Sequence, residues 1–156
     1  MKKPITILIV LSVLLNISLI YLFIFKGETT KTNDNRIAVV MTPDNTDFVL
    51  NEMRDFLESI QQINEGILNN DARKIIDAGK KSGGSVIDHA PKGLIKSLPI
   101  GFKKLGFATH NIFDEIKESA EANFIPKNTQ IQLNKLLNNC TACHKSYKIS
   151  TKQIRQ

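Results

Sequence analysis

The stretch TPDNTDFVLNEMRDFLESIQQINEGILNND, residues 42–71, sets the fold class of this chain of 156 residues. Its apolar residues recur at alternating spacings of four and three, and they are Val49, Met53, Phe56, Ile60, Ile63 and Ile67. This spacing places them on one stripe of an α-helix, with the heptad rhythm of a helix bundle. Thr42 suits the N-cap of this helix and Pro43 its first position. The pattern predicts a helix over residues 43–69.

Three further segments carry helix patterns. A short helix is predicted after Asn70 or Asp71, over ARKIIDAGKKS, and ends at two glycines. A third helix is expected from residue 98 up to NFIPKN (123–128), and a fourth from about residue 128 to 149. Four helices with short connections predict an all-α protein, with an antiparallel four-helix bundle over residues 42–149.

The N-terminus carries an uncharged run, ITILIVLSVLLNISLIYLFIF, at residues 5–25. As a helix it would be about 32 Å long, enough to cross a bilayer. The run is longer than the apolar region of a cleaved signal peptide, and no A-x-A site follows it. Residues 1–26 are therefore interpreted as a membrane anchor, in preference to a signal segment.

A polar linker is expected over residues 27–41. Its last part, IAVVM (37–41), has the composition of a short strand, but no second strand pattern is found to pair with it. We therefore expect this stretch to lead into the first bundle helix. At the other end of the chain, residues 150–156 are interpreted as a basic tail.

The charge distribution and the absence of known motifs exclude several classes of function. The net charge is +6, and six basic but no acidic residues follow residue 122. This excess suits either a solvated helix face or a docking surface for an acidic partner. No pattern of a helix-turn-helix, a zinc finger or an aromatic-basic surface indicates a nucleic-acid partner. No catalytic constellation is present, so the protein is predicted not to be an enzyme.

The stretch NNCTACHKSY (138–147) contains both cysteines of the chain, Cys140 and Cys143, and His144 follows directly. C-x-x-C-H is the attachment signature of c-type haem. In that chemistry two thiols add to the porphyrin vinyl groups, and the adjacent imidazole binds the iron. The spacing suits this role, because residues i, i+3 and i+4 share one side of a helix.

Three other interpretations of the motif remain open. A structural zinc site needs four ligands, so His89 or His110 would have to join the three in the motif. A redox dithiol of the thioredoxin type would accompany a βαβ pattern, which is absent from the sequence. A plain disulfide gives His144 no role. Covalent haem is the favoured interpretation.

The motif on the last helix of a predicted four-helix bundle resembles the class II c-type cytochromes, the cytochrome c′ type, over about residues 42–148. The resemblance implies one covalent haem c, with Cys140 and Cys143 as thioether links and His144 as the proximal iron ligand. Lys148 occupies the place of a basic residue that is frequent in the family. The family's members are exported. The resemblance therefore implies a haem domain in the periplasm, attached here to the cytoplasmic membrane by the N-terminal helix.

The sixth iron position separates two functions within this family. A methionine from the first helix gives a six-coordinate electron carrier, whereas an apolar residue leaves the iron open to small gases. Met53 lies on the core stripe of the first helix and is the expected sixth ligand. Met41, His89 and His110 are the alternatives.

The resulting prediction is a c-type cytochrome that transfers single electrons. Its predicted partners are redox proteins with acidic surfaces, and the resemblance also allows a homodimer. The alternative function is a five-coordinate haem protein that binds or senses nitric oxide or carbon monoxide. Further contacts with the haem are expected from Arg54, at a propionate, from Phe102, at the ring edge, and from Lys148.

Overall fold

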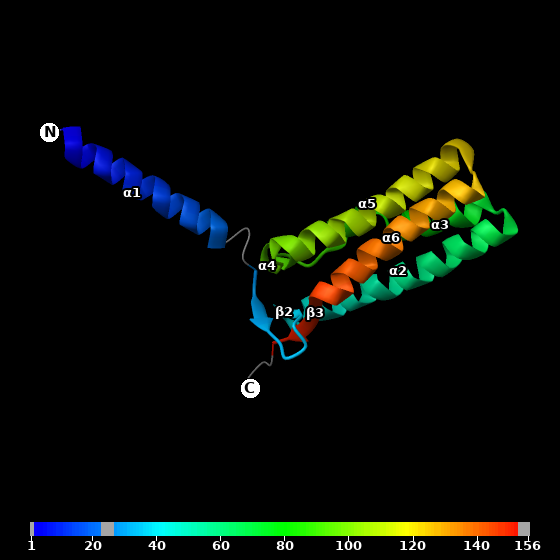
Figure 1. The fold of residues 1–156 in the computed structure, drawn as a ribbon, viewed down its shortest axis with the longest axis horizontal. Helices are drawn as coiled ribbons and strands as arrows, with labels where there is room; N and C mark the ends of the chain where they lie inside the picture. The colour runs from blue at the N-terminus through cyan, green and yellow to red at the C-terminus, as the bar shows by residue number, and fades with distance from the viewer. Residues whose placement is uncertain (1, 23–26, 153–156) are drawn as a thin grey trace.

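The computed structural model describes residues 2–22 and 27–152, which form a mostly helical protein with a small sheet at one end of the helices (Figure 1). Helix α1 (Lys2–Ile20) comes first. The other elements follow in the order β1 (Thr29–Lys31), β2 (Ile37–Met41), α2 (Pro43–Asn69), α3 (Ala72–Ser82), the 3-10 helix η2 (Gly84–His89), α4 (Leu94–Ser97), α5 (Ile100–Asn123), α6 (Pro126–Ser146) and β3 (Tyr147–Thr151).

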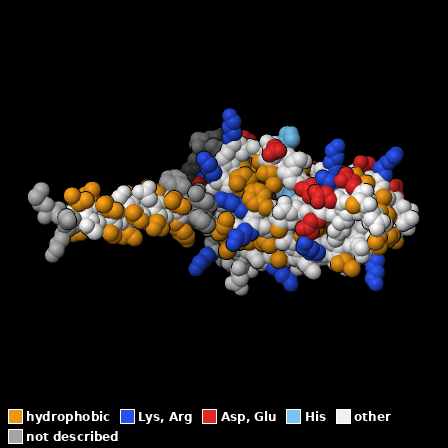
Figure 2. Space-filling view, turned by 90° about the horizontal axis from the view of Figure 1, so that it is seen from above, with side chains coloured by type: hydrophobic (Ala, Val, Ile, Leu, Met, Phe, Trp, Pro, Cys, Tyr) orange, Lys and Arg blue, Asp and Glu red, His pale blue; other side chains and the backbone are white. Residues whose placement is uncertain are grey.

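Helix α1 corrects the predicted membrane anchor. It has 19 residues and rises about 28 Å, less than the ~30 Å of a hydrocarbon core. Its side chains from Pro4 onward are exposed, as Figure 2 shows for its hydrophobic residues. Across the described ranges, 2–22 and 27–152, no helix is both long and apolar enough to cross a membrane. The predicted membrane-spanning helix and the membrane and periplasmic localisation are therefore wrong. Residues 23–25, the end of the predicted span, lie outside the described residues.

Four helices pack side by side in the main body of the molecule (Figure 1). Helix α2 contacts α3 and α6, and α5 contacts the same two helices. Helix α2 has the predicted bounds. Its Thr42 cap accepts a hydrogen bond from the Asn45 backbone N–H, and Pro43 opens the helix. The buried residues between these helices form the bundle core: Ile63, Ile75, Ala78, Ile112, Phe113, Ile116, Ala120, Leu133 and Leu136.

A three-stranded sheet overturns the prediction of an all-α fold. Strand β2 is its central strand, with β1 antiparallel on one side and β3 parallel on the other. The register pairs Ile37 with Tyr147 at one end and Met41 with Thr151 at the other. The chain leaves the helical conformation at Tyr147 because YKIST, rich in β-branched and aromatic residues, suits a strand. The predicted last helix is therefore too long. Residues 153–156, the end of the predicted basic tail, lie outside the described residues.

The sheet carries a core of its own. Val39 and Met41 of β2 are only 0% and 1% exposed, so β2 is a buried strand and not the end of a linker. They pack against residues that precede and open α5. Together these buried residues form the sheet core: Val39, Met41, Leu94, Leu98 and Phe102.

Helices α3 and α5 approach closely at Gly79. A Cβ there would lie 2.8 Å from both the Lys117 Cβ and the Phe113 carbonyl oxygen. Neither atom is the end of a flexible side chain. We therefore expect Gly79→Ala to push the helices apart and to lower the free energy of unfolding by about 1–3 kcal/mol. Urea unfolding followed by circular dichroism measures this change.

The matched control for this prediction is Lys80→Ala, at an exposed position of the same helix. It should change the free energy of unfolding by no more than about 0.5 kcal/mol. If Gly79→Ala were as stable as this control, α3 and α5 would not be packed as closely as the structure places them.

Candidate functional site

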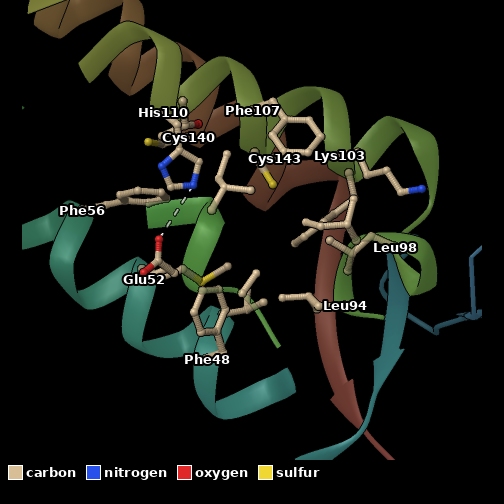
Figure 3. A pocket seen from close by; sticks show the side chains of 18 of the residues that line it. Phe48, Glu52, Phe56, Leu94, Leu98, Lys103, Phe107, His110, Cys140 and Cys143 are labelled. Atoms are coloured by element: carbon tan, nitrogen blue, oxygen red, sulfur yellow. Dashed lines mark ion pairs between the residues drawn. The ribbon is translucent and has the colours of Figure 1, made fainter. Parts of the chain in front are cut away.

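A pocket lies between the bundle core and the sheet core, with an empty volume of about 830 Å³ that includes its opening to solvent. Figure 3 shows it enclosed by side chains from several elements. Most of its lining is aromatic or aliphatic: Phe48, Val49, Phe56, Ile87, Ala90, Leu94, Ile95, Leu98, Phe102 and Phe107.

Both cysteines of the C-x-x-C-H motif line this pocket from α6. Cys140 packs against the bundle core and Cys143 against the sheet core, so the two half-buried side chains lie where the cores meet. Figure 3 shows the Cys143 sulfur pointing into the pocket. Their spacing on one helix therefore presents two sulfur atoms to the same apolar space.

The electrostatic surroundings keep both cysteines as neutral thiols. Burial raises the pKa of the Cys140 thiol. Burial, and then the neighbouring Cys140, raise the pKa of Cys143 to about 11. Cysteines in redox dithiols have lowered pKa values, because the thiolate is the nucleophile. These thiols therefore do not fit the dithiol interpretation.

His144 lines the same pocket from the last turn of α6, but its side chain is exposed. The spacing had placed this histidine on the same side of the helix as the two cysteines. The structure leaves this lining residue exposed to solvent. One edge of the site is therefore accessible from outside.

Met53 lines the pocket from α2 and is half-buried. The structure thus brings Met53 together with the C-x-x-C-H motif, although they lie at opposite ends of the predicted domain. The alternative Met41 lies in β2, within the sheet core, and does not line the pocket. Of the methionines in the described part of the chain, Met53 is the one that faces this space.

His110 and Glu52 form a polar pair in the wall of the pocket. His110 is only 7% exposed. Its Nδ1 lies 2.9 Å from the Ser82 carbonyl oxygen, which can only accept, so this nitrogen carries the hydrogen. Its Nε2 lies 3.8 Å from Glu52 Oε2, as Figure 3 marks. Burial raises the pKa of the Glu52 carboxyl, with a smaller contribution from the charge of Asp55.

The sequence interpretation missed Glu52 entirely and named His110 only as an alternative metal ligand. Phe56, on the predicted stripe of the first helix, contacts the His110 ring edge-on, with the ring centroids 4.9 Å apart. On the third predicted helix Leu105, Thr109, Ile112 and Ile116 recur at spacings of four and three. His110 lies next to this stripe, so a broader stripe would have included it. The other alternative ligand, His89, lies exposed in η2 and outside the pocket lining.

The structure brings one of the three further predicted contacts to the pocket. Phe102 is buried and lines it. Arg54 is exposed on α2, where its guanidinium donates to the Asn51 side chain. Lys148, in β3, pairs with Asp34 at 3.4 Å. Neither of these two cations belongs to the pocket lining.

The zinc interpretation depends on a fourth ligand near the motif. Among the described residues, no group of three or more His, Cys, Asp or Glu side chains has an arrangement that holds a metal ion. The geometry of the protein's own side chains thus gives no support to a structural zinc site here.

Comparison of the chain with known protein families, with curated proteins and with solved structures finds no match.

Proposed function

We propose that this protein carries one covalently bound haem c and transfers single electrons, as class II c-type cytochromes do. One observation carries the proposal. Cys140, Cys143 and His144, the complete attachment motif, line a single apolar pocket that also contains Met53. The motif alone indicates covalent haem, and the pocket gives the macrocycle a site next to it.

The residues present fit a haem in their chemistry. Most of the pocket wall is apolar, as an aromatic macrocycle requires. One edge of the site is open at His144, which suits charged propionates and an exchange of electrons with a partner. When bound, the haem supplies one-electron chemistry at its iron.

Each residue of the motif then has a defined role. The Cys140 and Cys143 thiols would hold the haem by adding across its two vinyl groups, so that each sulfur would bond to one vinyl carbon and its hydrogen would pass to the other. The His144 imidazole and the Met53 thioether would be the two protein ligands of the iron. A His/Met ligand pair raises the reduction potential relative to two histidines. Lys145, exposed beside His144, offers positive charge to an acidic redox partner.

A second candidate function rests on the Glu52–His110 pair. Hydrogen-bonding groups beside an open iron site help to decide which small ligands bind there. If Met53 does not bind the iron, this buried pair is available to contact a diatomic gas. The second candidate is therefore a five-coordinate haem protein that binds or senses nitric oxide or carbon monoxide.

A redox titration of the haem-loaded protein combined with a carbon monoxide titration separates the two functions. An electron carrier should follow a one-electron Nernst curve and bind carbon monoxide weakly, because its sixth site is filled. A ferrous protein that binds carbon monoxide rapidly and completely would instead support the gas-binding function.

A further inference from the structure

Tyr147 lies at the junction between the helix that carries the attachment motif and the strand that follows it. It is the C-cap of α6, and its backbone N–H donates a hydrogen bond to the Cys143 carbonyl oxygen. Its ring meets the Phe102 ring edge-on, with centroids 5.5 Å apart and an interplanar angle of 87°. Tyr147 therefore connects the last turn of α6 to the first turn of α5.

The Tyr147 hydroxyl lies directly over Gly101 in that first turn. A Cβ at Gly101 would overlap the hydroxyl oxygen, whereas it would lie 3.4 Å from the ring carbon Cζ, close to an ordinary contact. Gly101 is helical, a conformation that alanine also adopts. An alanine at position 101 would therefore force the Tyr147 hydroxyl to move.

Strand β3 also holds the end of α6 in place, through its pairing with β2. It runs on directly from α6 and pairs with β2 in five aligned positions. Beyond the last pair, the Lys152 backbone N–H donates to the Met41 carbonyl oxygen at 2.7 Å. Because β2 leads through Thr42 into α2, this pairing connects the end of α6 to the start of the helix that carries Met53.

We propose that Tyr147, seated on Gly101, is a positioning residue that fixes the last turn of α6 and thereby the orientation of His144 at the pocket. The inference rests on the proposed function, because His144 acts here as the proximal ligand of a haem. The arrangement around an axial histidine tunes the properties of the metal that it binds. A displaced Tyr147 should therefore change the spectroscopic signature of the haem, beyond any loss of stability.

The test uses three variants of the haem-loaded full chain: Gly101→Ala, Tyr147→Phe and the double variant. Gly101→Ala should displace Tyr147 and give a shifted or split ferric electron paramagnetic resonance signal, together with a shifted reduction potential. Tyr147→Phe keeps the ring, so its resonance signal and reduction potential should be close to those of the wild type. The double variant should return to the wild-type signal, because removal of the hydroxyl makes room for the new methyl group.

Lys104→Ala, at an exposed position of α5, is the matched control and should leave the signal unchanged. The inference is overturned if Gly101→Ala has the wild-type signal, or changes only the melting temperature. It is equally overturned if the resonance signal of the double variant differs from that of the wild type as much as the signal of Gly101→Ala does. If Gly101→Ala does not fold, the double variant must restore both folding and the signal. A wild type without covalent haem would instead overturn the proposed function, which separates the two failures.

Discussion

Replacing both Cys140 and Cys143 by alanine is expected to abolish covalent attachment of haem completely. The wild type should retain all of its haem when it is denatured and extracted with acidified ketone. The double variant should release all of it, because the thioether bonds are formed by these two sulfur atoms alone. Both side chains are half-buried at the junction of the two cores, so the substitutions remove two sulfurs without introducing a polar group.

The matched control is Thr141→Ala, between the two cysteines and exposed on the same helix. This variant should retain its haem as the wild type does. Haem that stayed attached to the denatured double variant would show that another residue forms the bond. The role assigned to the C-x-x-C-H motif would then be lost.

Met53→Leu is expected to open the sixth coordination position. The substitution conserves volume and apolarity, so its cost to folding should be below about 1.5 kcal/mol. The ferric wild type should be low-spin, with a weak near-infrared band from methionine bound to iron, and the ferrous form should bind carbon monoxide poorly. The variant should lose that band, become high-spin and bind carbon monoxide readily. Near-infrared absorption and a carbon monoxide titration measure both effects.

Met41→Leu is the control for this experiment. Met41 undergoes the same chemical change at a position that is 1% exposed and outside the pocket lining, so the haem spectrum should not change. If the wild type were already high-spin and Met53→Leu left the spectrum unchanged, Met53 would be only a packing residue. Gas binding would then become the favoured function. If both proteins were low-spin, a histidine would hold the sixth site. His110, which lines the pocket, would be the first to replace.

The helices were predictable because their signals are local. Residues 43–69 carry a stripe with regular spacing, a capping threonine and a proline at the first helical position, and all three lie within one segment. The sheet was not predictable in this way. IAVVM has the composition of a strand, but its partner YKIST lies at the far end of the chain and looks like the continuation of α6. Pairing between such distant segments leaves no local pattern.

The residues of the candidate site also differ in whether a local pattern could predict them. The motif residues were found from their spacing, and Met53 from the resemblance to class II cytochromes together with its place on the helix stripe, and the structure brings them to one pocket. Arg54 was chosen for its charge and Lys148 for its place in the family resemblance, but Arg54 is exposed and Lys148 pairs with Asp34. A local pattern shows which face of a helix is apolar. It does not show which polar side chains a neighbouring helix will bury, and the Glu52–His110 pair depends on such a contact.

The most direct test of the central claim is a pyridine haemochrome assay on the denatured wild-type protein, produced in a host that attaches haem to C-x-x-C-H motifs. We predict one haem per chain, with the spectrum of a c-type haem, that stays with the polypeptide through extraction in acidified ketone. Haem that extracts into the ketone, or a protein without haem, would contradict covalent attachment at Cys140 and Cys143 and with it the proposed function.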